Sequence, residues 1–366
     1  MRLARRATPL RGGQPRAFAV GFIVALLLGA VLLIASGFNP LEVYAKMFDT
    51  SLGSLAAISK TLTRAVPLGL AGLAVAVAGS MGLWNIGAEG QIIAGAIGAA
   101  WMARLGPDLP GPVLIPLMLL AGILGGALLA FGPGVARSRL GVNEIITTLM
   151  LNEVALRAVR YLLNGPWKDP DGNNFPMAPR LPQQSELPTL FERANVGLVI
   201  AVAVVALFGI FASRSAWGYE LRVAGSSAKA AEYVGISLRR KILTVLVLSG
   251  GIAGLAGGLE LAGSAERLNE NIAGPGFGFA GIIVAALALM RPSGVAAVAV
   301  AFGAVQVGGI GIRTTGVPGS IANVLQALIL LGALTAAVLS SYEVVRGGRA
   351  APAADASAPV DGAAAV

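Results

Sequence analysis

Long apolar segments alternate with short polar segments along most of the 366-residue chain. A helix needs about 20 consecutive apolar residues to cross the hydrocarbon core of a bilayer. The pattern therefore predicts an all-α, polytopic membrane protein with about ten transmembrane helices, of which the eighth is short enough to be broken or re-entrant. The expected spans are 17–36, 62–79, 86–103, 112–132, 143–163, 195–212, 242–263, 278–290, 294–311 and 320–340.

Composition agrees with this pattern. Only 12% of the residues are charged, whereas a soluble domain carries about 25%. Helices in lipid associate through small residues that let their backbones approach closely, and the chain holds 50 glycines. Small residues recur every fourth position in two spans and form a ridge in each. The ridge of the third span is Gly90, Ala94 and Gly98, and that of the seventh is Gly250, Gly254 and Gly258. Continuous apolar runs exclude a barrel, whose strands alternate over about 10 residues.

Basic residues predict the orientation of the chain. Loop 213–241 carries six basic and two acidic residues, whereas loop 164–193 carries three basic and four acidic residues. Lys and Arg accumulate in cytoplasmic loops, so 213–241 is expected in the cytoplasm and the proline-rich 164–193 outside. The net charge of +9 is better explained by this rule than by nucleic-acid binding, because no basic face with interleaved aromatic residues is present.

These assignments divide the chain into three parts in the cytoplasmic (inner) membrane. Residues 1–16 form a basic cytoplasmic N-terminus, followed by an uncleaved first helix. Residues 17–345 form the transmembrane domain. The tail 346–366 is rich in Ala and Pro and is expected to be disordered. Both termini are predicted to be cytoplasmic.

Two polar residues begin the third span. Asn85 and Glu89 are four residues apart and share one helix face just inside the membrane. Because an ionisable group there is costly, it normally faces protein or water. The pair either supports a neighbouring loop or helix end, or lines the path of a transported solute.

The fifth span carries a polar face. At 100° per residue, Glu144, Thr147, Thr148 and Asn152 lie within one sector of the helix, whereas Glu153 points to the opposite face. Four polar side chains on one face indicate either a hydrated interior or hydrogen bonding between helices. We retain both interpretations.

Loop 213–241 is expected to contain a short polar helix. Ser226 or Ser227 can cap it, it runs to about Val234, and Gly235 can end it. A solvated basic loop is the alternative.

The chain has no histidine and no cysteine. This excludes thiolate or imidazole metal sites and a Ser-His-Asp triad, so we expect neither a catalytic residue nor a metal ligand. No lysine follows a glycine, so a phosphate-binding loop of the form G-x-x-x-x-G-K-[ST] is absent. We therefore expect no bound cofactor, and any ATP must bind on another polypeptide.

Three stretches resemble the branched permeases of ABC importers, in the nucleoside or simple-sugar subgroup. Residues 82–91 are similar to G-L-F-N-I-G-x-E-G-Q, with Trp84 in place of Phe. Residues 141–152 resemble G-x-N-E-[IV]-I-T-T-L-M-L-N, and residues 222–235 resemble R-x-x-G-x-x-x-x-A-A-x-x-x-G. A further stretch, 276–279, is similar to G-[FY]-G-[FW]. Their order follows the family from about residue 20 to 345.

The resemblance implies a permease that translocates nucleosides or related sugars and hydrolyses nothing itself. Its implied partners are a cytoplasmic ABC ATPase, a second homologous permease that makes a heterodimer, and an extracytoplasmic substrate-binding lipoprotein. The third stretch is implied to be the segment that couples to the ATPase. Lys229 stands there where many ABC permeases have Glu. The implied coupling residues are Arg222, Gly225, Ala230, Ala231, Glu232 and Gly235.

Two other classes of function remain open on the residues alone. An ion-coupled secondary transporter of small polar solutes would use Glu89 or Glu144 to bind a proton or sodium ion. An integral membrane enzyme is disfavoured by the lack of His, Cys and clustered acidic residues.

Overall fold

The computed structural model describes residues 2–5, 13–172, 175–274, 276–340 and 342–345. The predicted tail 346–366 and much of 1–16 lie outside the described residues. The described part is mostly helical and has almost no strands, which confirms the predicted all-α class. Its helices are α1 (Gly13–Ala35), α2 (Pro40–Leu52), α3 (Leu55–Gly79), α4 (Ala88–Leu105), α5 (Gly111–Leu140), α6 (Glu144–Asn164), α7 (Gly197–Arg214), α8 (Ala216–Ser226), α9 (Ala228–Tyr233), α10 (Leu238–Glu260), α11 (Phe277–Leu287), α12 (Pro292–Gly311) and α13 (Gly319–Ser340).

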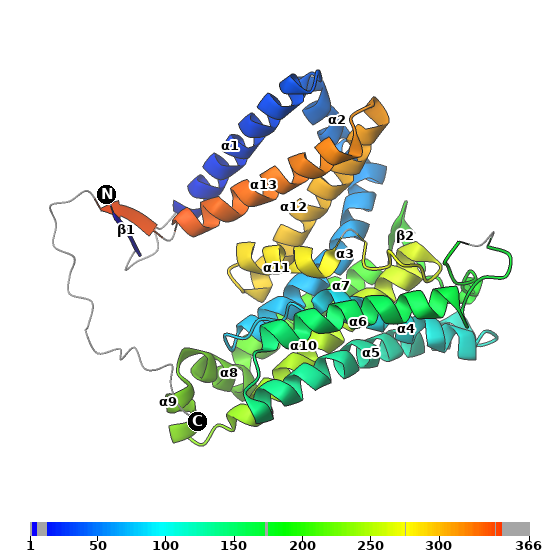
Figure 1. Ribbon diagram of the computed structural model, residues 1–366, viewed down its shortest axis with the longest axis vertical. Coiled ribbons are helices and arrows are strands. Elements are labelled where there is room, and N and C mark those ends of the chain that lie inside the picture. Colours follow the sequence, from blue (N-terminus) through cyan, green and yellow to red (C-terminus); the bar gives the residue numbers. More distant parts are fainter. Residues whose placement is uncertain (1, 6–12, 173–174, 275, 341, 346–366) are drawn as a thin grey trace.

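Short elements complete the structure. β2 (Thr189–Phe191) and β3 (Ala194–Asn195) form a hairpin, and β1 (Arg2–Arg5) pairs antiparallel with β4 (Tyr342–Val345). Single turns of helix are η1 (Gln183–Ser185), η2 (Leu261–Ala265) and η3 (Ile312–Thr315). In Figure 1, α4, α5, α6 and α10 lie side by side, α3 runs through the centre, and α1 pairs with α13.

Each of the ten predicted spans corresponds to a helix, although the boundaries differ. In the described residues, six helices are long and apolar enough to cross a membrane, α10 and α12 being counted with the turns that follow them. The eighth expected span is α11, whose 11 residues cover about 16 Å against a hydrocarbon core of about 30 Å. The chain is thus a multi-pass membrane protein in which α11 does not cross the bilayer alone.

Two helices, α2 and α8, were not predicted. In α2, the Asn39 side chain accepts a hydrogen bond from the amide of Leu41, and Pro40 occupies the first turn. Both features favour a helix start. Only one narrow face of α2, made by Val43, Met47 and Ser51, is buried, so its mixed composition did not resemble a span. The other helix, α8, was expected to be loop.

Loops gather at two ends of the bundle. We call one end the α9 end, where Gly225 lies against the turn at Ser80. We call the other the β2 end, where the hydroxyl of Ser59 accepts a hydrogen bond from the amide of the hairpin residue Arg193. Successive spans run between these ends in alternating directions, as the predicted topology requires. Which end faces the cytoplasm stays a prediction. The α9 end holds 80–87, 137–144, 213–241 and 288–292, and the β2 end holds 105–111, 164–172, 175–196, 261–274 and 312–318.

Glycines hold α4, α5 and α10 together. A Cβ atom at Gly95 or Gly126 would overlap the backbone of α10 at Gly254 or Gly250, and one at Gly254 would overlap Gly122 of α5. The backbones therefore touch, which maximises dispersion contacts where no hydrophobic effect operates between helices. Ala94 and Gly98 of the first ridge and the ridge from Gly250 to Gly258 lie at interfaces between these three helices, whereas Gly90 lies against Asn152 of α6.

Substituting Gly126 by Ala should destabilise the protein, because the added methyl group meets backbone that cannot move aside. We expect a cost of about 1–3 kcal/mol and a lower thermal unfolding midpoint of the full chain in detergent. Gly132→Ala, on the same helix, is the control because nothing lies within 4 Å of its added Cβ. Equal midpoints for the two variants would contradict close packing of α5 on α10.

Candidate functional site

The segment between α3 and α4 enters the bundle without forming a helix. Asn85 donates to the hydroxyl of Ser249 at 2.8 Å, and Ser249 lies 11 residues into α10, about 16 Å along its axis. Non-helical backbone at such a depth is stable only where protein satisfies its polar groups. The segment 80–87 is therefore a re-entrant turn, and we refer to it by that name.

Asn85 is the centre of this turn and is 1% exposed. Its side-chain amide exchanges two hydrogen bonds with the Gln91 side chain, at 2.7 and 3.1 Å, and its Oδ1 accepts from the amide of Gly87 at 3.0 Å. Its donor and acceptor atoms are thus engaged within the chain. In this structure Asn85 fixes the shape of the turn.

The polar face of α6 bonds to two more backbone groups of the turn and to the start of α4. Asn152 donates to the carbonyl of Ile86 at 2.9 Å and accepts from the amide of Gly90 at 2.9 Å. Glu144 accepts from the amide of Trp84 at 3.3 Å, and its other oxygen lies 3.1 Å from Nε of Arg137. The first two motifs of the sequence are therefore joined by hydrogen bonds.

The two threonines of this face differ. Thr148 is 1% exposed, donates to the carbonyl of Glu144 at 2.6 Å and contacts Gly87. Thr147 is partly exposed and bonds only carbonyls of its own helix turn. Of the four sector residues, Thr147 is thus the one without a tight contact to the re-entrant turn.

Glu89 connects the starts of two helices. Its Oε2 accepts from the amide of Gly278 at 2.7 Å, in the first turn of α11, where a carboxylate is favoured by the helix dipole. A Cβ at Gly278 would overlap the backbone of Glu89. The fourth stretch, 276–279, is therefore placed directly on the motif that contains Glu89.

The opposite face of α6 is unpartnered within the described residues. Glu153 and Arg157 lie 3.9 Å apart near the middle of the helix, with 66% and 75% of their side-chain surfaces exposed. As predicted, Glu153 points away from the sector of Glu144 and Thr148. α6 is not one of the six strongly apolar helices, although its 21 residues are long enough to cross a bilayer. Two exposed charges at the middle of such a helix require water or another protein chain beside them.

The expected short helix of loop 213–241 is α9. Ser227 caps it by accepting from the amide of Ala230 at 3.2 Å, and Gly235 follows in the left-handed conformation with φ +78°, which favours glycine. Ala231 is fully buried, whereas Tyr233 is 94% exposed. The helix is therefore anchored on one side and open on the other.

The implied coupling residues separate into two groups. Arg222 donates to the carbonyl of Ala212 at 2.6 Å, and Gly225 lies against Ser80, so these two attach α8 to the bundle. Ala230 and Glu232 are exposed on α9. The exposed Tyr233 was not singled out in the sequence, where a lone tyrosine in a basic loop gives no signal.

The structure contains a polar cavity at the β2 end that the sequence did not predict. Its volume is about 870 Å³, and it is lined by α2, α3, α12, η2 and the β2–β3 turn. Arg64 of α3 and Glu260 of α10 lie on its wall with Nη1 and Oε1 4.0 Å apart. The sequence places these two residues 196 positions apart, so only the fold brings them together.

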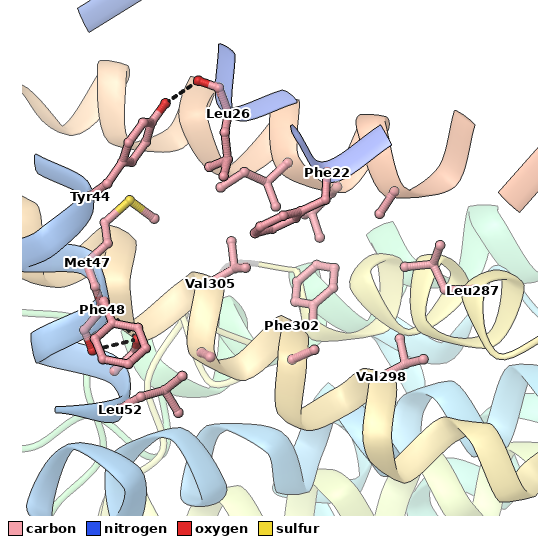
Figure 2. Close-up of a pocket in the computed structure, with 16 residues that line it drawn as sticks. Phe22, Leu26, Tyr44, Met47, Phe48, Leu52, Leu287, Val298, Phe302 and Val305 are labelled. Atoms are coloured by element: carbon pink, nitrogen blue, oxygen red, sulfur yellow. Dashed lines mark hydrogen bonds between the residues drawn. The ribbon is translucent and has the colours of Figure 1, made fainter. Parts of the chain in front are cut away.

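A second cavity, of about 560 Å³, is apolar (Figure 2). Phe22, Phe48 and Phe302 point into it, and the two hydroxyl groups on its wall donate to backbone carbonyls: Tyr44 to Leu26 and Ser51 to Met47. It offers a polar solute no free hydrogen-bonding group from these side chains. It therefore suits acyl chains better than a transported solute.

Comparison with known proteins identifies the family. Residues 57–334 match the family described as "Branched-chain amino acid transport system / permease component". A glucose ABC transporter permease protein of Haloferax volcanii is 37% identical over 93% of this chain and 92% of its own length. A nucleoside ABC transporter permease protein of Lactococcus lactis is 32% identical, covering 85% and 88%. A guanosine ABC transporter permease protein of Bacillus subtilis is 32% identical, covering 89% and 93%.

These matches confirm the resemblance drawn from the motifs, which lie within the matched range. The features described above therefore belong to a transport protein. They are the re-entrant turn bonded to α6, the exposed capped helix α9 at one end and the polar cavity at the other. The chain belongs to the branched-chain amino acid transport system permease family and is a membrane-spanning permease of the ABC transporter type.

Proposed function

We propose that the chain imports nucleosides or related simple sugars across the cytoplasmic membrane as one permease of an ABC importer. The family match over residues 57–334 carries this proposal. The substrate class is supported by the names of relatives that cover most of the chain, which are a glucose permease and two nucleoside permeases. Both substrates carry a polyhydroxylated ring, and both are uncharged.

Energy is proposed to come from ATP bound on a separate ATPase chain. The support is α9, a short helix anchored through Ala231 and exposed at Tyr233 and Val234. An exposed aromatic tip on a rigid support is the kind of residue that dominates protein–protein binding. α9 also leads through Gly235 directly into α10, so a push on α9 is transmitted to a continuous helix of 23 residues.

A second homologous permease is proposed to face α6, with the solute path between the two chains. Glu153 and Arg157 support this, because an exposed ion pair at mid-span is stable beside water or protein but not beside lipid. Of the residues expected along the path, Asn85, Glu144, Thr148 and Asn152 would shape it by fixing the re-entrant turn. Thr147 would contact it. Glu89 would hold the start of α11 beside it.

The remaining partner is an extracytoplasmic lipoprotein that delivers the solute to the β2 end. This orientation puts both termini and the basic loop 213–241 in the cytoplasm. Its support is the contrast in charge between loops 213–241 and 164–193 together with their location at opposite ends of the bundle.

The energy source separates this proposal from a secondary transporter. Vesicles containing the full complex should accumulate guanosine or glucose only when ATP is supplied on the ATPase side. With ATP withheld and a proton or sodium gradient imposed, uptake should remain at background. Gradient-driven uptake by the chain without an ATPase subunit would overturn the ABC mechanism for this protein.

Tyr233→Ala should weaken attachment of the ATPase. Loss of a binding hot spot costs about 2 kcal/mol or more, which corresponds to about 30-fold weaker binding. The measurement is co-purification of the ATPase together with ATP-dependent uptake. Phe175→Ala, which removes an aromatic residue that is 65% exposed at the β2 end, should leave co-purification of the ATPase unchanged. Normal ATPase binding by Tyr233→Ala would remove α9 as the contact.

Glu153→Leu should reduce uptake without destabilising the isolated chain. Its carboxylate is exposed and its ion pair with Arg157 is loose, and such exposed pairs contribute about 0–1 kcal/mol. The thermal midpoint in detergent should therefore not change, while uptake falls if the pair faces the path. Asp108→Asn, in an exposed loop of the β2 end, is the control. Full uptake by Glu153→Leu would place this face outside the path.

A further inference from the structure

The polar cavity contains a pair of opposite charges in an unusual setting. Arg64 and Glu260 retain only 24% and 11% of their side-chain exposure, yet their nearest charged atoms stay 4.0 Å apart. Nε of Arg64 donates to Gln306 at 3.1 Å, and the guanidinium lies 4.6 Å from the centre of the Phe277 ring. The four side chains of this cluster thus come from four helices, α3, α10, α11 and α12.

Much of the hydrogen-bonding capacity of this pair is unused. A guanidinium has five N–H donors, and within the described residues Arg64 uses one, toward Gln306. The Glu260 carboxylate accepts no hydrogen bond from any described residue. Buried charges normally pair directly and saturate their hydrogen bonds, because removing them from water is costly. Here both partners instead keep free positions that face a cavity.

The cavity suits a small molecule. Its volume of about 870 Å³ lies within the range of about 300–1,000 Å³ that is typical of small-molecule sites. The hydroxyl of Ser264 lines it without a hydrogen bond to any described residue, and Thr63 lines it from α3. The wall thus adds hydroxyl groups to the ion pair.

The charges define the class of ligand. Five other charged side chains line the cavity, but they are more exposed to water than the pair: Lys46, Lys60, Glu192, Arg193 and Glu266. The buried pair itself sums to zero, so an anion beside it would be opposed by Glu260 and a cation by Arg64. A hydroxyl group both donates and accepts, so two adjacent hydroxyls can donate to the carboxylate while accepting from the guanidinium. A neutral molecule with neighbouring hydroxyl groups therefore satisfies both residues without leaving a net charge buried.

We propose that the cavity at the β2 end is a binding site for a neutral polyhydroxylated solute, held by Arg64 and Glu260. The site lies inside one chain and is distinct from the path proposed along α6. It rests on the proposed function in one respect, since the solute tested is the transported one. Because Glu260 is the last residue of α10 and α9 precedes that helix, the site and the ATPase contact lie at opposite ends of one helix.

The lack of native cysteine allows a direct test. Ser264→Cys in the full complex should react with an impermeant thiol reagent, and the reaction should slow when D-glucose, D-ribose or guanosine is present at saturating concentration. Asp108→Cys, at the same end of the molecule and outside the cavity, should react at a rate that no solute changes. Glycine betaine at the same osmolarity is the solute control.

The charge pair is tested in the same background. Adding Glu260→Gln or Arg64→Gln should raise the solute concentration for half-maximal protection about tenfold or more, as expected for loss of a charge-assisted hydrogen bond. Glu186→Gln, which removes an ion-paired carboxylate at the same end but outside the cavity, should leave it unchanged. Size-exclusion profiles and ATPase co-purification identify any variant that fails to fold.

Each other outcome is decisive. If the complex transports solute but no solute protects Ser264→Cys, the cavity is not a binding site and the proposed function stands. Protection by inorganic phosphate but not by neutral solutes would overturn the assignment of ligand class. If the unmodified complex shows no ATP-dependent uptake while protection persists, the proposed function fails and the site remains.

Discussion

Backbone groups that leave the helical pattern inside a bilayer must be hydrogen-bonded by protein, and this constraint organises the molecule. The re-entrant turn 80–87 is the place where it acts most strongly. Asn85 closes the turn on itself and on α10, while Asn152 and Glu144 of α6 bond to its exposed amides and carbonyls. Polar residues that are costly in a lipid environment are thereby buried without free hydrogen-bonding groups, and α6 is held in one orientation.

That orientation decides what the outer face of α6 presents. With Thr148 and Asn152 turned inward, Glu153 and Arg157 are turned outward. The same helix thus completes the fold on one side and leaves a charged strip on the other. An exposed ion pair at the middle of the helix needs water or a second chain beside it.

Close packing of glycines makes α10 a rigid connection between the two ends. Gly250 and Gly254 lie against α5, and Gly257 lies against α4 at Ile92, so the helix cannot bend easily between them. At 1.5 Å per residue its 23 residues extend about 35 Å. It begins beside α9, where the ATPase is proposed to bind, and ends at Glu260 in the polar cavity. Movement at one end would therefore reach the other through packed backbone.

The sequence by itself determined the features that are local or periodic. Apolar length predicted the spans, glycine spacing predicted close helix contacts, and Ser226 or Ser227 with Gly235 predicted the short helix that is α9. It also found Asn85 and Asn152, but not that they bond to the same turn, because contacts between residues about 65 positions apart leave no periodic signal. The pairing of Arg64 with Glu260 was decided only by the tertiary structure, since the two residues lie 196 positions apart in the sequence. Their chemistry depends on the cavity that α3, α10 and α12 enclose, and a cavity is a property of packed helices rather than of any one of them.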